Sequence, residues 1–68
     1  MKWYCIYGWA YYGVKIYFSH TKDGFPRWSE GQVWAKKMTR YAARIRIQKF
    51  KRFLKKGSVI KIEALEGI

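Results

Sequence analysis

The residues of this sequence that could do chemistry are concentrated in one strongly basic stretch. Between Lys36 and Lys56, ten of twenty-one residues are lysine or arginine, and none is aspartate or glutamate. An ordinary solvated surface intersperses both signs of charge, and like charges one helical turn apart repel each other. A stretch of this composition predicts a surface that binds a polyanion, because such a partner would relieve the repulsion.

The groups that build an enzyme active site are scarce in the sequence. The chain has one histidine, one cysteine and four acidic residues, whereas acid-base or nucleophilic catalysis needs partnered groups. His20 and Asp23 lie three positions apart, a spacing that favours a local turn contact over a catalytic pair. No spacing typical of a metal site or of a phosphate-binding glycine loop occurs. We therefore expect no enzymatic activity, no cofactor and no small-molecule substrate.

The single cysteine indicates the cellular compartment in which the protein is expected to work. Cys5 alternates with Trp3 and Tyr7 in an apolar run, which predicts a buried structural thiol. It cannot form an intramolecular disulfide, and this favours a reducing compartment. The apolar runs are much shorter than the roughly 20 residues that span a bilayer, and the first residues lack the pattern of a signal peptide. We expect a cytoplasmic protein and no membrane partner.

Aromatic side chains dominate the first half of the chain, since eleven of fourteen lie at or before Trp34. Half the residues are hydrophobic, so these 68 residues are expected to fold as one domain, residues 1–68, despite a formal net charge of +11. We expect Trp3 and most of the other tryptophans in the core, together with Ile6 and Phe18. Candidates for stacking on bases or for contacting a partner are Trp9, Tyr11 and Tyr12, because neighbouring strand residues cannot all be buried.

The first half also predicts a β-hairpin. Residues 2–7 and 14–19 are rich in aromatic and β-branched side chains, which favours two strands. Gly8 and Gly13 predict that the chain turns between these strands, somewhere within residues 8–13.

Residues 20–31 contain many turn-forming residues. They predict a loop with a turn at residues 22–24, held to the core by Phe25 and Trp28. A short edge strand through Val33 and Trp34 is a further expectation for residues 32–38.

An amphipathic helix is predicted for residues 39–56. Thr39 suits the N-cap, and no glycine or proline follows until Gly57, which suits the C-cap. One stripe of apolar positions is expected to face the core, and it comprises Ala42, Ala43, Ile47, Phe50, Phe53 and Leu54. A strand through residues 44–47 is the competing interpretation, but the alternation breaks at Lys49.

Residues 58–64 alternate as a half-buried strand does, with Ile60, Ile62 and Ala64 expected to face the helix. The predicted fold is therefore α+β: a small antiparallel sheet of three or four strands in the order ββ(β)αβ, with one basic amphipathic helix packed on it.

The predicted polyanion-binding residues lie on or beside the helix, away from its apolar stripe. They are Lys36, Lys37, Arg40, Arg44, Lys49, Lys51, Arg52 and Lys55. Tyr41 and Ile45 fall on the same side and would form a small apolar spot, which makes Tyr41 a further candidate for a partner contact.

Nucleic acid, either DNA or RNA, is the leading partner, because neutralising phosphates with lysine and arginine gives affinity without any motif. The chain has no base-reading motif, so binding is expected to be largely independent of sequence. The alternative is a protein-protein interaction module that docks on an acidic protein surface. The sequence leaves open whether the protein is a monomer or a homodimer.

The stretch Trp34-Ala-Lys-Lys-Met-Thr-Arg-Tyr-Ala-Ala follows an aromatic hairpin and precedes Gly57-Ser-Val-Ile-Lys-Ile-Glu. This layout resembles that of small uncharacterised phage-encoded proteins, over most of the chain. The resemblance implies the order hairpin, helix, strand, and a place in the host cytoplasm. It implies either a nucleic-acid-binding accessory protein or an inhibitor of a host enzyme or defence complex, and it carries over no functional residues.

Overall fold

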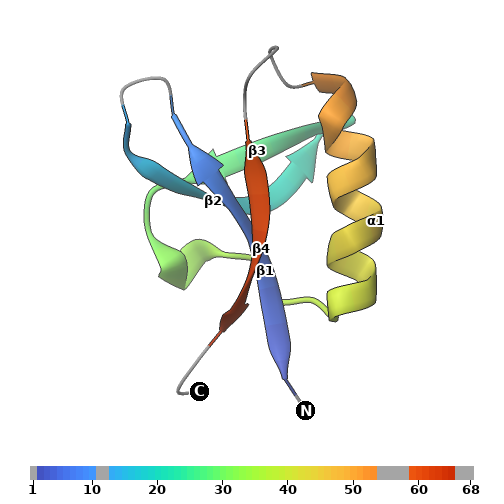
Figure 1. The fold of residues 1–68 in the computed structure, drawn as a ribbon. Helices are drawn as coiled ribbons and strands as arrows, with labels where there is room; N and C mark the ends of the chain where they lie inside the picture. Colours follow the sequence, from blue (N-terminus) through green and yellow to red (C-terminus); the bar gives the residue numbers. More distant parts are fainter. Residues whose placement is uncertain (1, 11–12, 54–58, 66–68) are drawn as a thin grey trace.

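In the computed structural model, which describes residues 2–10, 13–53 and 59–65, a four-stranded antiparallel sheet carries one α-helix on one face (Figure 1). The strands are β1 (Trp3–Trp9), β2 (Lys15–Lys22), β3 (Phe25–Ser29) and β4 (Ile60–Leu65). Between β3 and β4 come a 3-10 turn η1 (Gln32–Trp34), the helix α1 (Arg40–Phe50) and a second 3-10 turn η2 (Lys51–Phe53). The strand order is β3-β2-β1-β4, which confirms the predicted α+β fold.

The hairpin of β1 and β2 is confirmed, but β1 continues through Gly8, which we had placed in the turn region. Gly8 pairs with Ile16 of β2 on one side and with Ile60 of β4 on the other. A Cβ atom at this position would lie 3.1 Å from the carbonyl oxygen of Val59 and 3.1 Å from Cγ2 of Ile60. The glycine therefore allows β4 to approach β1 closely.

The predicted loop at residues 20–31 is wrong in part, because it contains the end of β2 and all of β3. The predicted turn itself is present, with positive φ angles of 54° at Asp23 and 82° at Gly24. Two consecutive positive φ angles match the twist of antiparallel strands, so Asp23 and Gly24 form a hairpin turn. Pro26 is compatible with a strand here because β3 lies at the edge of the sheet.

The predicted edge strand through Val33 and Trp34 is wrong, because these residues form η1 and are 84% and 67% exposed. The strand-like contacts come a few residues later. The backbone N–H of Lys36 donates to the carbonyl oxygen of Phe18 at 2.9 Å, and Met38 exchanges two backbone hydrogen bonds with Tyr4. The connection into the helix is thus tied to both β2 and β1.

The helix is confirmed against the competing strand, with the predicted N-cap. The hydroxyl oxygen of Thr39 accepts a hydrogen bond from the backbone N–H of Ala42 at 3.1 Å. The α-helix ends earlier than predicted, at Phe50, and residues 51–53 form the 3-10 turn η2. The predicted continuation over residues 54–56, the core position Leu54 and the C-cap Gly57 lie outside the described residues. No helix within the described ranges is long and apolar enough to cross a bilayer.

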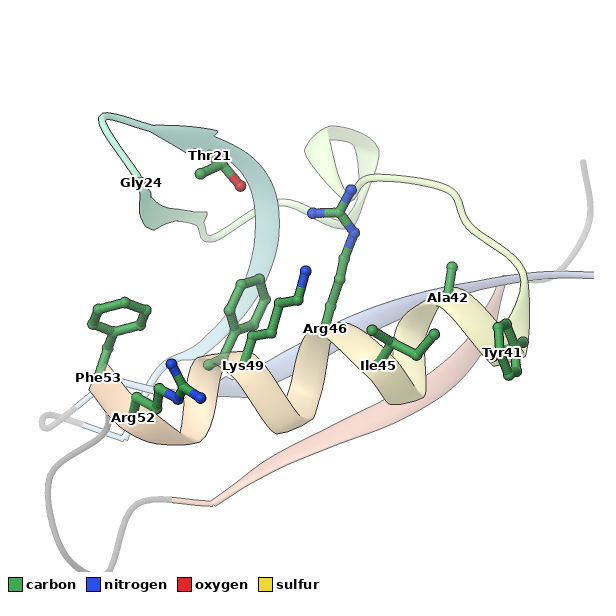
Figure 2. Close-up of a pocket in the computed structure, with 10 residues that line it drawn as sticks. Thr21, Gly24, Tyr41, Ala42, Ile45, Arg46, Lys49, Arg52 and Phe53 are labelled. Carbon is green, nitrogen blue, oxygen red and sulfur yellow. The ribbon is translucent and has the colours of Figure 1, made fainter.

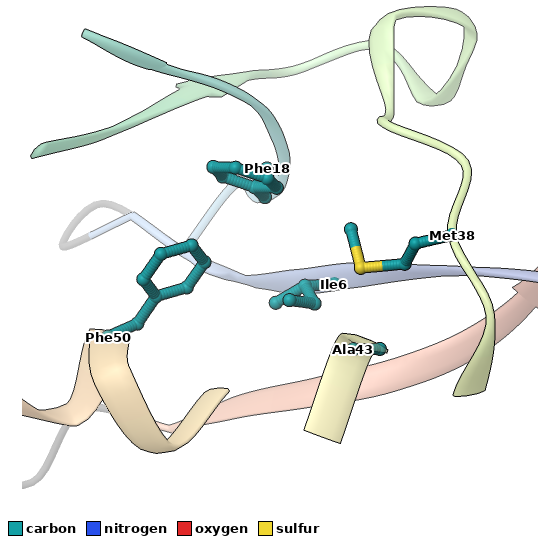
Figure 3. Packing of buried hydrophobic residues seen from close by; sticks show 5 residues of the cluster. All are labelled: Ile6, Phe18, Met38, Ala43 and Phe50. Carbon is teal, nitrogen blue, oxygen red and sulfur yellow. The ribbon is translucent and has the colours of Figure 1, made fainter. Parts of the chain in front are cut away.

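The core lies between α1 and the sheet (Figure 3). Its buried members come from β1, β2, the connection before the helix and the helix itself: Ile6, Phe18, Met38, Ala43 and Phe50. The rings of Phe18 and Phe50 are 4.8 Å apart, and Ile60 and Ile62 pack against this cluster as predicted.

Our expectation that most tryptophans are buried is wrong. Only Trp28 packs against the core cluster, whereas Trp3, Trp9 and Trp34 are 41%, 47% and 67% exposed. Trp3 and Trp9 alternate with Ile6 and Gly8 along β1, so their side chains point to the face of the sheet that carries no helix.

Removing one methyl group from the core should measurably weaken the fold. We expect Ile6→Val to lower the free energy of unfolding by about 0.5–1.5 kcal/mol, because Ile6 is fully buried. Urea denaturation followed by circular dichroism would measure the change. The control, Val33→Ala, truncates an exposed side chain and should change the same quantity by less than about 0.5 kcal/mol. Equal losses in the two variants would contradict this description of the core.

Candidate nucleic-acid interface

The cations of α1 and of the following turn η2 divide between two flanks of the helix, because its buried side is fixed on the sheet. Ala43 and Phe50 are buried and Ile47 is half-buried, so these three residues face the core. At 100° per residue, the remaining positions fall on either side of that stripe. The groove flank, on the side of the β2–β3 hairpin, carries Arg46, Lys49 and Arg52. The β4 flank, on the other side, carries Arg40, Arg44 and Lys51.

The groove flank borders an open groove of about 710 Å³ between the helix and the β2–β3 hairpin (Figure 2). Thr21 and Gly24 contribute the hairpin wall. The helical wall presents three cations and three aromatic rings: Arg46, Lys49, Arg52, Tyr41, Phe50 and Phe53. No carboxylate is among the described residues that line this groove. The groove therefore combines positive charge with apolar surface.

Arg46 is a member of this site that the sequence analysis missed. Its guanidinium carbon lies 5.5 Å from the centre of the Phe18 ring, and the side chain is half-buried. An arginine can lie against apolar surface along its stem while its charged end stays accessible. The position of Arg46 on the helical wheel, at the margin of the apolar stripe, was the signal that could have identified it.

Tyr41 and Ile45, which we predicted to form an apolar spot beside the cations, both line the groove. They are 76% and 40% exposed. Phe53, at the other end of the groove, is also about half exposed and meets Phe25 edge-on, with 5.1 Å between the ring centres. The apolar spot and half of the helical cations thus belong to one surface.

The structure does not bring together all of the predicted cations. Arg40, Arg44 and Lys51 are exposed on the β4 flank and do not line the groove. Lys36 and Lys37 are exposed in the connection that precedes the helix. Lys55 lies outside the described residues. Of the seven predicted cations that the structure describes, Lys49 and Arg52 line the groove, where Arg46 joins them.

One carboxylate, that of Glu63, lies on the face of the sheet away from α1. Lys15 and Glu63 form an ion pair with Nζ 2.9 Å from Oε1, and the side-chain amide of Gln32 donates to Oε2 at 3.2 Å. The hydrogen bond to Glu63 raises the pKa of Lys15. Within the described ranges, no cation of α1 forms an ion pair with a carboxylate.

The face of the sheet without a helix carries a small aromatic group. The rings of Tyr7 and Trp9 meet edge-on at 5.4 Å, and the ammonium groups of Lys15 and Lys61 lie over them, 4.3 Å from the Tyr7 ring and 6.0 Å from the Trp9 ring. Trp9 is half exposed and remains a candidate contact residue. The other two candidates of that tip, Tyr11 and Tyr12, lie outside the described residues.

Cys5 and His20, which we considered for catalysis, lie in surroundings that are typical of structural residues. Cys5 is fully buried, and its burial together with the nearby charge of Glu63 raises the pKa of the thiol to about 11. Nδ1 of His20 lies 3.0 Å from the hydroxyl oxygen of Ser19, and within the described part of the chain it forms no hydrogen bond with Asp23. Among the described residues, no group of three histidine, cysteine or acidic side chains could hold a metal ion.

Fold and site together define a small basic α+β domain with a cationic, aromatic-lined groove beside its helix. Comparisons of the chain with protein-family models, curated proteins and solved structures found no match. A functional assignment for this chain therefore depends on the physical properties of its own surface.

The environment of Cys5 predicts slow alkylation of the folded protein. With a pKa raised to about 11 and a fully buried side chain, almost no exposed thiolate exists at pH 8. Iodoacetamide should modify Cys5 slowly under native conditions and rapidly in concentrated denaturant, as mass spectrometry would show. Comparable rates in both conditions would contradict the buried environment.

The raised pKa of Cys5 also makes the stability of the fold depend on pH. An unfolded thiol has a lower pKa and loses its proton first, so stability should fall as the pH rises above about 9 and on towards about 11. Urea denaturation of the wild type and of Cys5→Ala at pH 8 and pH 10.5 would separate this contribution. We expect a larger loss of stability at the higher pH for the wild type. An equal loss in both proteins would mean that Cys5 is not its source.

Proposed function

We propose that this protein binds nucleic acid through the cations of α1, largely without regard to base sequence. The observation that carries the proposal is the charge of the helix: it has basic residues on both flanks and no acidic residue. Phosphates neutralised by lysine and arginine release their counterions, and this gives affinity that needs no base contact. The repulsion among cations one turn apart, such as Arg40 and Arg44, falls when the phosphate backbone lies against them.

The proposal extends to the biological setting that the resemblance implies, a phage accessory protein that acts in the host cytoplasm. DNA and RNA are both candidate partners, because the two share the phosphate backbone that the helix would contact. Under this proposal the protein contributes binding and no catalysis.

A second candidate function is protein-protein interaction, such as inhibition of a host enzyme or defence complex through an acidic surface. It is favoured by the large exposed side chains of Val33 and Trp34, which lie outside the groove. Exposed tryptophan is common at the centre of protein interfaces. A pull-down from nuclease-treated host lysate would test it, and the absence of any protein in stoichiometric amount would count against this candidate.

If the helix contacts phosphates, neutralising two of its cations should weaken binding and reduce its salt dependence. We expect Arg44→Gln with Lys49→Gln to lower affinity for labelled DNA and RNA, and to reduce the slope of log affinity against log salt by about 2. Fluorescence anisotropy between roughly 50 and 200 mM salt would measure both quantities.

The matched control is Lys2→Gln with Arg27→Gln, which removes one lysine and one arginine from exposed positions on β3 and beside β1, away from the helix. Both variants take the formal net charge from +11 to +9, since each loses two positive charges. The control should bind nearly as well as the wild type. Equal losses in both variants would mean that affinity follows net charge alone. No binding by the wild type even at low salt would contradict the proposed function.

A further inference from the structure

We infer that the groove between α1 and the β2–β3 hairpin is a binding site for single-stranded nucleic acid, with unpaired bases against its apolar lining and phosphates on Arg46, Lys49 and Arg52. This inference rests on the proposed function and gives it a substrate class. It differs from that proposal in assigning unequal roles to the two flanks of the helix.

The spacing of the groove cations suits an extended backbone. The three residues follow one another at intervals of three positions, and within α1 a rise of 1.5 Å per residue separates the Cα atoms of Arg46 and Lys49 by about 4.5 Å along the helix axis. Long flexible side chains at this spacing can reach successive phosphates of one strand. Figure 2 shows Arg46 and Lys49 extending from the helix on the side where Thr21 lies. Their charged ends therefore stand within the groove.

The apolar part of the groove lining gives a reason to bind single strands in preference to duplexes. Tyr41, Ile45 and Phe53 are 76%, 40% and 49% exposed, and all three line the groove. An unpaired base can stack on such side chains whatever its identity, whereas a duplex keeps its bases stacked inside and offers only phosphates. A groove that joins cations to exposed rings therefore favours single strands over duplexes.

Arg46 is held in place before any ligand binds. Its guanidinium carbon lies 5.5 Å from the centre of the Phe18 ring and the side chain is half-buried, and both limit the conformations it can adopt. A planar guanidinium fixed in this way can donate two parallel hydrogen bonds to a phosphate, and less conformational entropy is lost on binding. The half-buried cation thus serves as a fixed contact point at the base of the groove.

The β4 flank provides a comparison within the same helix. It carries the same number of described cations as the groove flank, but these cations do not line the groove or its aromatic side chains. If positive charge alone determined binding, the two flanks would contribute equally. If the groove binds single strands, the flanks differ, and the difference is specific to single-stranded ligands.

Paired charge reversals test this difference. The groove variant is Lys49→Glu with Arg52→Glu, and the matched variant is Arg44→Glu with Lys51→Glu. Each takes the formal net charge from +11 to +7, since two reversals remove four units of charge, and each alters one residue of α1 and one of η2. Circular dichroism would verify that both variants stay folded. Anisotropy with a labelled oligothymidylate and with a duplex of the same length would give the affinities.

We expect the wild type to bind the single strand at least 10-fold more tightly than the duplex. The groove variant should lose at least 10-fold more affinity for the single strand than the matched variant does. For the duplex, the two variants should lose similar amounts.

A second pair of variants isolates stacking from charge. Tyr41→Ala removes an exposed ring that lines the groove, and Trp34→Ala removes an exposed ring outside it. Tyr41→Ala should weaken single-strand binding by about 5- to 100-fold and leave the salt slope unchanged, because a stacked base contributes affinity without releasing a counterion. Trp34→Ala should leave the affinity for the single strand within about 2-fold of the wild type.

The outcomes separate this inference from the proposed function. Binding of duplex and single strand with equal affinity, or equal losses in the two charge-reversal variants, would overturn the inference and leave the proposed function intact. Competition by polyglutamate as effective as that by unlabelled oligothymidylate would also overturn it, because the groove would then accept any polyanion. Absence of binding to both nucleic acids would overturn the inference and the proposed function together.

Discussion

The contact between Phe18 of β2 and Phe50 of α1 is the interaction on which the rest of this surface depends. The two rings are 4.8 Å apart, and with the buried Ala43 they fix how the helix is rotated about its axis on the sheet. Successive helical side chains are 100° apart, so this rotation also determines where every cation points. With the rotation fixed, Arg46 and Lys49 face the β2–β3 hairpin. The core therefore defines the groove as well as the stability of the domain.

The charge of Glu63 is kept apart from the cations of the helix. The ion pair of Lys15 with Glu63 lies on the face of the sheet away from the helix, where a carboxylate cannot neutralise the helical cations. Cations crowded on one helix repel each other in the free protein. The fold tolerates this repulsion because apolar packing beneath the helix holds the helix on the sheet. An external polyanion would remove the repulsion, and under the proposed function this relief contributes to affinity.

Much of the fold could be predicted from local patterns, because the helix stripe, the Thr39 N-cap and the alternation of the last strand are local. The third strand was missed because Asp23 and Gly24 occur in loops and in hairpin turns alike, and only the pairing with β2 distinguishes them. The exposed tryptophans were missed because alternation defines the two faces of a strand, not which face the helix covers. The groove was missed because its hairpin wall, with Thr21, is distant in sequence from Arg46.

The most direct test of this account is to map the contact surface in solution, using amide chemical shifts of the isotope-labelled protein titrated with an oligothymidylate. The account predicts that the largest changes fall on the two walls of the groove, at Thr21 and Gly24 on one side and at Ile45, Arg46 and Lys49 on the other. Changes concentrated on the β4 flank, or on the sheet face around Trp9 and Lys61, would contradict it. In that case the groove would not be the site where nucleic acid binds.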